Sequence, residues 1–229
     1  MDIIEKRITK RHLSESELSG VNYYNCIFER IQLDNFNFRD CEFEKCRFVN
    51  CSIKNLKLNF FKLIDCEFKD CLLQGVNAAD IMFPCTFSLV NCDLRFVDFI
   101  SLRLQKSIFL SSRFRDCLFE ETDLRKSDFT GSEFNNTEFR HSDLSHCDFS
   151  MTEGLDINPE INRILSIKIP QEAGLKILKR MGVVVGDEVS RPAGCPDGPL
   201  LRTGPAELPH PAPDRSVSPH IFQKEWNID

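Results

Sequence analysis

Cysteine is the residue of this chain with the widest chemical potential, because a thiolate can bind a metal, form a disulfide or act as a nucleophile. The chain contains 11 cysteines, but Cys-x2-Cys pairs of the zinc-binding type are absent and the recurring gap is four residues. Nine cysteines occupy one slot, two residues before a Leu or Phe or, for Cys51, an Ile, that elsewhere holds Ser, Thr or Val. Such a slot selects small, buried side chains, so we expect free thiols in a reducing cytoplasm and neither a metal nor a cofactor. The nine are Cys26, Cys41, Cys46, Cys51, Cys66, Cys71, Cys92, Cys117 and Cys147.

A second group with chemical potential is His141, Asp143, His146 and Asp148, beside Cys147. These types could ligate a metal or transfer protons, but their spacing places the two histidines at corners of successive sides of the repeat described below. A solvated surface is therefore the favoured interpretation. The sequence also contains no nucleophile elbow, phosphate loop, dinucleotide fingerprint or zinc-protease helix. We expect a non-catalytic protein, and an enzyme whose activity is lost on His146→Ala is the weakest alternative.

The elements that carry these residues follow a five-residue period. Leu or Phe recurs at nearly every fifth position for about 140 residues, first from Leu13 to Phe83 and then, after a one-residue slip, from Leu89 to Phe149. A period of five fits neither the 3.6 residues of a helix turn nor the alternation of a strand. It is typical of a solenoid.

The period also predicts the shape of one coil. The central Leu or Phe and the residue two before it face inward, which describes a short extended side, and the remaining residues turn the corner. Four sides give a coil of about 20 residues, and the period then predicts about seven coils stacked roughly 4.8 Å apart in an all-β solenoid. The slip at 84–88 is expected to form a bulge at Pro84. The predicted core column contains Phe28, Phe48, Phe68, Leu89, Phe109, Phe129 and Phe149.

The sequence divides into four parts. They are an N-terminal cap at 1–12, the β-helix at 13–151, a C-terminal strand and capping helix at 152–186, and a Pro-rich tail at 187–229. Alternation at 161–169 predicts the strand. Pro170 begins the helix, which carries Leu175, Leu178 and Met181 on one face. The tail holds most of the 11 prolines and is expected to be flexible.

Charge limits the possible partners. The formal net charge is −6, and there is no basic block of the kind that binds nucleic acid directly. No apolar run is long enough to span a membrane, and the N-terminus lacks a signal peptide, so a cytoplasmic location is expected. One side of the solenoid is predicted to be acidic. It collects Glu17, Asp40, Asp80, Asp98, Glu120, Glu121 and Glu138 against Arg39, Lys57 and Arg140.

This acidic side has two interpretations. A mixed solvated surface is what any soluble rod needs. Alternatively, a stiff rod near the width of duplex DNA could present its carboxylates to a protein that normally grips phosphates.

The pattern of a small residue, any residue, Leu or Phe, and two variable residues resembles the pentapeptide repeat proteins. More closely, residues 1–186 resemble the immunity proteins that accompany the gyrase-targeting peptide antibiotic microcin B. The opening Met1 to Arg7 and the segment Ile177 to Val185 carry this second resemblance. Residues 187–229 lie outside it.

The resemblance implies a right-handed four-sided β-helix that binds DNA gyrase, a type II topoisomerase, and protects it from a poison that traps cleaved DNA. Other members of the same family protect gyrase from quinolones, so the resemblance implies this activity as an extension. The C-terminal helix resembles the one by which quinolone-resistance members dimerise, which implies a homodimer through Leu175, Leu178 and Met181. Because the net charge is modest, specific docking onto gyrase is favoured over pure DNA mimicry. The alternative function is a structural scaffold or adaptor whose rod spaces other proteins.

Overall fold

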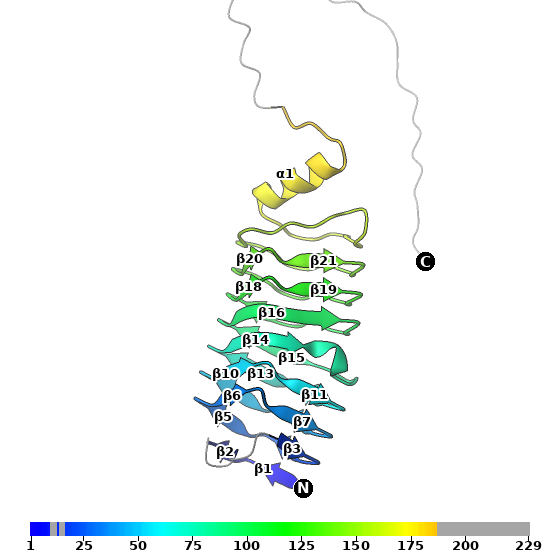
Figure 1. Ribbon diagram of the computed structural model, residues 1–229. Helices are drawn as coiled ribbons and strands as arrows, with labels where there is room; N and C mark the ends of the chain where they lie inside the picture. The colour runs from blue at the N-terminus through cyan, green and yellow to red at the C-terminus, as the bar shows by residue number, and fades with distance from the viewer. Residues whose placement is uncertain (10–12, 14–16, 187–229) are drawn as a thin grey trace, which may run out of the picture. The chain divides into compact units, whose positions relative to one another are not determined.

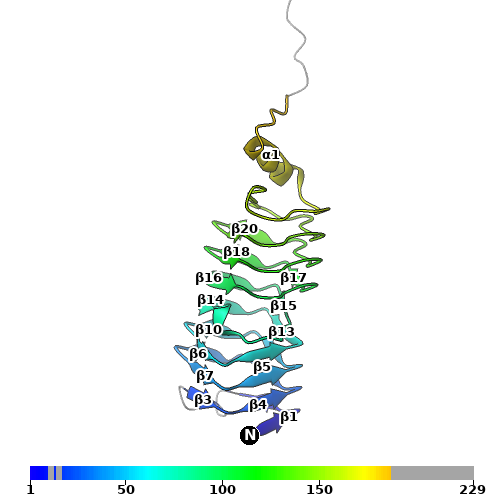
Figure 2. The same ribbon diagram turned by 90° about the vertical axis from the view of Figure 1, so that its right-hand side faces the viewer.

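The computed structural model describes residues 1–9, 13 and 17–186. The expected Pro-rich tail at 187–229 lies outside these residues. Within them the chain winds into a stack of short parallel strands that ends in one α-helix, α1 (Gln171–Arg180) (Figures 1 and 2). The parallel β-solenoid predicted from the five-residue period is confirmed.

The strands form the four sides of the coil, numbered here in chain order. Side 1 contains β1 (Asp2–Ile4), β4 (Asn22–Tyr24), β8 (Glu42–Glu44) and β12 (Lys62–Ile64). Side 2 contains β2 (Arg7–Ile8), β5 (Ile27–Glu29), β9 (Arg47–Val49), β13 (Cys66–Lys69), β15 (Phe87–Val90) and β17 (Phe109–Leu110). Side 3 contains β6 (Gln32–Asp34), β10 (Ser52–Lys54), β14 (Leu72–Asn77), β16 (Asp93–Ile100), β18 (Arg113–Arg115) and β20 (Glu133–Asn135). Side 4 contains β3 (Glu17–Ser19), β7 (Asn37–Arg39), β11 (Lys57–Asn59), the 3-10 turn η2 (Ala78–Asp80), the end of β16, β19 (Leu118–Glu120) and β21 (Glu138–Arg140).

The register follows the predicted coil length. Phe28 pairs with Phe48, and Phe48 pairs with Phe68, so equivalent residues are 20 positions apart. Phe68 then pairs with Leu89, which adds the one extra residue of the slip. Leu89 pairs with Phe109, and the original spacing resumes.

Most corners of the described coils are built on a left-handed backbone residue. Nearly every fifth residue in the described coils has a positive φ, for example 51° at Asn25 and 53° at Arg30. Asn, Asp and Gly are common at these positions, because they tolerate the left-handed region best. The corner N–H then donates to a carbonyl one coil further on, at 2.9 Å from Asn25 to Glu44. Each corner therefore offsets its backbone strain with a hydrogen bond between coils.

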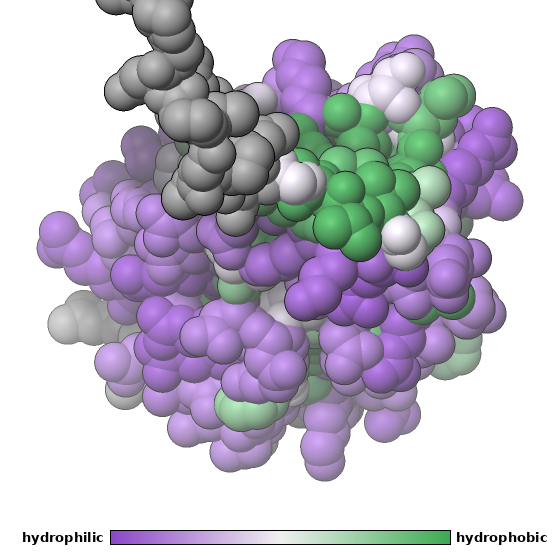
Figure 3. Space-filling view, turned by 90° about the horizontal axis from the view of Figure 1, so that it is seen from above, coloured by the Kyte–Doolittle hydropathy of each residue, from purple (hydrophilic) through white to green (hydrophobic). Residues whose placement is uncertain are grey.

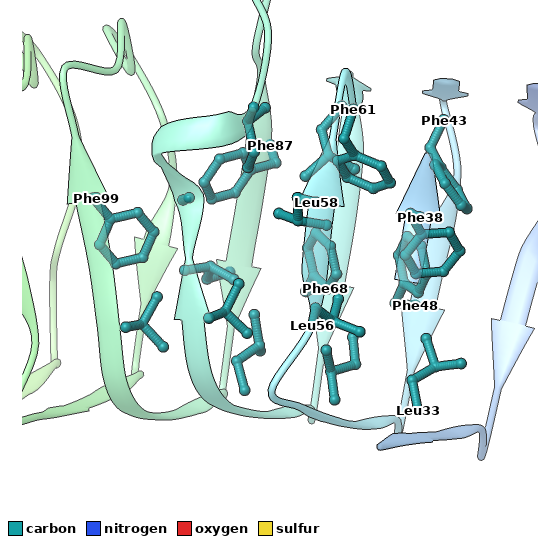
Figure 4. A pocket seen from close by; sticks show the side chains of 18 residues that line it. Leu33, Phe38, Phe43, Phe48, Leu56, Leu58, Phe61, Phe68, Phe87 and Phe99 are labelled. Atoms are coloured by element: carbon teal, nitrogen blue, oxygen red, sulfur yellow. The ribbon is translucent and has the colours of Figure 1, made fainter. Parts of the chain in front are cut away.

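The inward Phe and Leu side chains fill the centre of the rod (Figure 4). Phe48 and Phe68 stack with ring centroids 4.5 Å apart and 7° between planes, and Phe129 and Phe149 stack at 4.8 Å and 9°. One apolar cavity of about 50 Å³ lies at mid-rod, where the small Ala78 takes a position that Leu or Phe holds in other coils.

The small side chains two residues before the central Leu or Phe also form hydrogen bonds, which residue size alone does not predict. The Cys46 thiol donates to the carbonyl of Tyr23, and the Thr122 hydroxyl donates to that of Phe99 at 2.8 Å. The ten described cysteines are free and buried. Burial raises the pKa of the Cys147 thiol to about 12, so this thiol stays protonated at neutral pH.

Three details differ from the sequence expectations. Strands β1 and β2 pair with β4 and β5, so coiling begins inside the segment expected as a cap at 1–12. Phe83 is predicted to face inward, but it is 69% exposed. The extra residue of the slip comes before Cys85, so Cys85 is buried where Phe83 was expected. The segment 161–169 is not a strand; it continues the coil through single bridges, such as that of Lys168 to Asp148.

Candidate interaction surfaces

Side 4 carries the predicted acidic residues on its outward and corner positions. Asp98 lies in β16, Glu120 in β19 and Glu138 in β21, and all three belong to one continuous ladder. The others follow. Asp40 is at the corner after β7, Asp80 ends η2, and Glu121 is at the corner after β19. Glu17 begins β3, but its side chain lies outside the described part of the structure.

One of these carboxylates is neutralised by a neighbour. Arg140 donates from Nε to Glu138 at 2.6 Å, whereas the Ser101 hydroxyl donates to Glu121 at 3.0 Å and leaves the charge of Glu121 in place. Among the residues the structure describes, five of these carboxylates form no ion pair: Asp40, Asp80, Asp98, Glu120 and Glu121. The available negative charge of side 4 is therefore carried by these five residues.

A cluster of guanidinium groups on side 3 was missed by sequence reasoning. The Arg95 guanidinium donates to the Asp93 carboxylate at 2.6 Å, and Arg113 and Arg115 each approach it to 3.9 Å. Burial alone would raise the pKa of Asp93, but these three arginines outweigh it and lower the pKa below its usual range. The 20-residue repeat contains the signal, since positions 93, 95, 113 and 115 become neighbours only once the coil is closed.

The His and Asp group does not converge. His141 and His146 lie at successive corners with φ of 51° and 63°, and both are exposed. Asp143 lies 3.9 Å from Arg163, and Asp148 pairs with Lys168 at 2.6 Å. The aspartates thus serve as surface ion-pair partners, and no group of three or more potential metal ligands comes together among the described residues.

The helix α1 closes the C-terminal end of the β-helix. It buries Ala173 and Ile177 against the last coil, and Arg180 pairs with Asp156 at 2.7 Å. The three residues predicted to form its apolar face are exposed by 37% to 61%. They are Leu175, Leu178 and Met181. Together with Val183 and Val184 they form the apolar patch visible at this end of the molecule (Figure 3). No helix in the described residues has the length and apolar character needed to cross a membrane.

Comparison with known proteins agrees with this geometry. The family model "Pentapeptide repeats" matches residues 112–150, in 8 copies. Residues 112–150 therefore carry pentapeptide repeats within the β-helix. Most of the other described coils show the same corner geometry and register outside the matched segment.

Among solved structures, the chain is similar to full-length QnrB1, described as a plasmid-mediated fluoroquinolone resistance protein. The two are 19% identical over 80% of this chain and 97% of QnrB1, with a TM-score of 0.46. It is also similar to HetL, a pentapeptide repeat protein involved in heterocyst differentiation regulation from the cyanobacterium Nostoc sp. strain PCC 7120. That match is 10% identical over 74% of this chain and 83% of HetL, with a TM-score of 0.45.

Proposed function

We propose that this pentapeptide-repeat protein is a non-catalytic immunity protein that acts in the cytoplasm. It binds DNA gyrase and protects it from a gyrase-poisoning peptide toxin of the microcin B type. The observation that carries the proposal is the set of unpaired carboxylates Asp40, Asp80, Asp98, Glu120 and Glu121 on one side of a rigid rod. The resemblance of residues 1–7 and 177–185 to microcin B immunity proteins supports the choice of partner.

The architecture supports docking rather than chemistry. The core is filled by Phe and Leu, so only the outer faces are available to a partner. A β-helix with parallel ladders on its sides presents charges at fixed positions, and little conformational entropy is lost when it binds. The net charge of −6 spread over the chain is small for a mimic of duplex DNA. Docking that displaces the toxin from the gyrase–DNA complex therefore suits this surface better than competition with DNA.

A supercoiling assay with gyrase and the toxin tests the proposal. Purified wild-type protein should restore supercoiling, and no restoration at several molar equivalents would remove the proposal. Reversing two side-4 charges, Asp98→Lys with Glu120→Lys, should abolish rescue. The matched control Asp34→Lys with Glu133→Lys makes the same charge change on side 3 and should retain it. Equal rescue by both variants would exclude side 4 as the contact, and a quinolone in place of the toxin measures the breadth of protection.

A pull-down separates this function from the scaffold alternative. Gyrase should be the dominant partner of the full-length protein. A set of other proteins without gyrase would favour an adaptor role instead.

The exposed apolar face of α1 supports a homodimer within the same proposal. Leu175, Leu178 and Met181 expose carbon surface that a second copy of α1 would cover. Light scattering should give the mass of two chains for the wild type and of one chain for Leu178→Asp. Gln171→Asp adds the same charge on the polar part of the helix and should remain dimeric.

A further inference from the structure

Two of the described left-handed corners hold a Phe, whereas the others hold polar or charged residues, Gly or, at position 151, Met. Phe60 and Phe96 both have a φ of 53°, a left-handed conformation in which a bulky side chain is an outlier. They are also exposed, by 67% and 58%, so their rings contribute little to the core. Asn would satisfy both corners at lower cost to the fold. Neither ring gains enough packing to offset its unfavourable backbone conformation. Such strain is a reason to look for a function of the side chain.

Phe60 stands between two carboxylates. Asn59 pairs with Arg39 and Phe61 pairs with Ile81, so Asp40 and Asp80 lie one coil away on either side of Phe60 along the same corner. The coil spacing of about 4.8 Å sets these backbone separations. Both carboxylates are exposed and form no ion pair among the described residues.

A surface groove opens beside the ring. It is lined by Phe60, Met82, Asp40, Glu42 and Lys62, among others. Lys62 pairs with Glu42 at 3.1 Å, so these two charges cancel. The groove therefore combines an open aromatic face and a thioether with an uncompensated negative charge.

This combination matches one kind of ligand. A guanidinium group is planar and stacks on an aromatic face while its N–H groups bind carboxylates in pairs. An ammonium group is a compact point charge and is more strongly hydrated, so it gains less from the same ring. The molecule already contains this pairing nearby, because Arg103 lies over the exposed ring of Phe83 at 5.2 Å. No cation in the described residues lies over Phe60.

We propose that Phe60, Asp40, Asp80 and Met82 form a site that takes an arginine side chain of a protein partner. The ring of Phe60 stacks on the guanidinium plane, and the two carboxylates accept its N–H groups. The site rests on the proposed function only for the identity of the partner, namely gyrase. A protein surface that binds phosphates is rich in arginine, which fits this role.

Phe96 provides a matched control within the same chain. It has the same φ and a similar exposure, but its corner neighbours are Gly75 and Asp116. It also directly follows Arg95 of the guanidinium cluster. Phe96 therefore has one neighbouring carboxylate, which already accepts a hydrogen bond from the Asn136 amide at 2.6 Å, and it lies beside guanidinium groups that repel a further arginine. It should bind an arginine more weakly than Phe60.

Methyl NMR on the full-length protein tests the site without gyrase. The chain has 4 methionines, so methionine labelling with carbon-13 gives a spectrum in which Met82 reports on the groove. Titration with N-acetyl-argininamide should shift the Met82 methyl signal in a saturable way and leave Met151 and Met181 unchanged. N-acetyl-lysinamide should bind more weakly. Phe60→Asn should reduce the affinity about two- to fivefold, with an unchanged or higher Tm, and Phe96→Asn should have no effect.

Three results would overturn the site: no shift of Met82 in the wild type, equal affinity for the two amides, or equal affinity in Phe60→Asn and Phe96→Asn. The gyrase assay is a separate arm. If the wild type rescues gyrase, Phe60→Asn should require several-fold more protein than Phe96→Asn, and equal requirements would overturn the role of the site in docking. If the wild type does not rescue gyrase, the proposed function fails, while the methyl titration still decides whether the arginine site exists.

Discussion

Replacing Phe129 by Ala should be among the most damaging single changes to the fold. The ring is fully buried and lies between Phe109 and Phe149, with centroid distances of 4.8 Å on both sides; it is stacked on Phe149 and tilted by 37° against Phe109. It also makes edge or tilted contacts with Phe114, Phe119, Phe134 and Phe139 at 5.9–6.4 Å. Truncation of a buried Phe to Ala costs about 3–5 kcal/mol through lost transfer free energy and cavity formation.

The solenoid favours the upper part of that range for Phe129. The neighbouring coils are tied together by ladder hydrogen bonds, so they cannot collapse into the cavity, and each lost ring pair adds about 0.5–1.5 kcal/mol. Phe68 has a close ring partner on only one side, Phe48, and already borders the mid-rod cavity. Phe68→Ala should therefore cost less than Phe129→Ala, at about 3 kcal/mol.

Urea unfolding of the full-length variants, followed by circular dichroism, measures both costs. The slope of the free energy of unfolding against urea should stay near the wild-type value, so that midpoints can be compared. Phe96→Ala, an exposed corner Phe, serves as the control and should lose less than about 1 kcal/mol. A cost below about 2 kcal/mol for Phe129→Ala, or a larger cost for Phe68→Ala, would refute the argument from ring stacking.

Three further predictions concern the backbone, the charges and the thiols. Gly154→Ala should destabilise the protein strongly, because the φ of Gly154 is 72° and an added Cβ would lie 2.0 Å from the Phe134 carbonyl oxygen. The control is Gly20→Ala, since Gly20 has a φ of 66° and open space around it. This control should cost only about 1 kcal/mol in the same unfolding assay. The hydrogen bond from Lys168 lowers the pKa of Asp148 to about 2, below its value in the unfolded chain, so its stabilisation is present above about pH 4 and is lost as the pH falls toward 2. Solvent screening limits it to less than about 1 kcal/mol, and in Asp148→Asn this part of the pH dependence should be missing from acid titrations of stability. Alkylation by iodoacetamide, read by mass spectrometry, should be far slower at the ten described thiols in the native protein than after unfolding, and fast native modification would contradict their burial.

Most of the coil was predictable from the sequence because two of every five residues face a closed core. Because these two positions must stay small or apolar, the five-residue period remains visible whatever residues face outward. The pairing of Phe48 with Phe68 follows directly from this period. The same period reaches back to Ile3 and Ile8, which lie in the first coil, and forward to Ile164 and Ile169, which pack against the core. These residues were missed from the sequence because 1–12 was assigned to a charged cap and 161–169 to an alternating strand.

The slip could not be placed from the sequence, because several apolar residues compete for the inward position there. Met82 and Phe83 are exposed, whereas Cys85 and Phe87 are buried. Hydrophobicity alone favours Phe83 over Cys85, but the ladder that fixes Phe61 opposite Ile81 and Cys66 opposite Phe87 decides the frame. Long-range register therefore overrides local preference at this point.

The acidic side shows a similar limit. A 20-residue repeat assigns Glu120, Glu121 and Glu138 to one side of the rod, and the structure places them there. It does not reveal which charges are neutralised, because the pairing of Glu138 with Arg140 depends on side-chain geometry. The groove at Phe60 was missed for the same reason, since sequence reasoning treated corner positions as variable.

Corner residues are more informative about function than the outward charges of this fold. An outward position on a side accepts almost any polar residue at little cost to stability, so an Asp or Glu there is weak evidence of selection. A corner imposes a left-handed backbone on every coil, and a large apolar residue there is unfavourable both for the backbone and for solvation. Phe60 is an aromatic corner residue with carboxylates on both adjacent coils, whereas Phe96 has a carboxylate on only one adjacent coil and directly follows Arg95. Both residues carry the same backbone and solvation cost, but only Phe60 is proposed to bind an arginine. Comparing the two variants therefore separates the contribution of binding from the cost of the corner Phe itself.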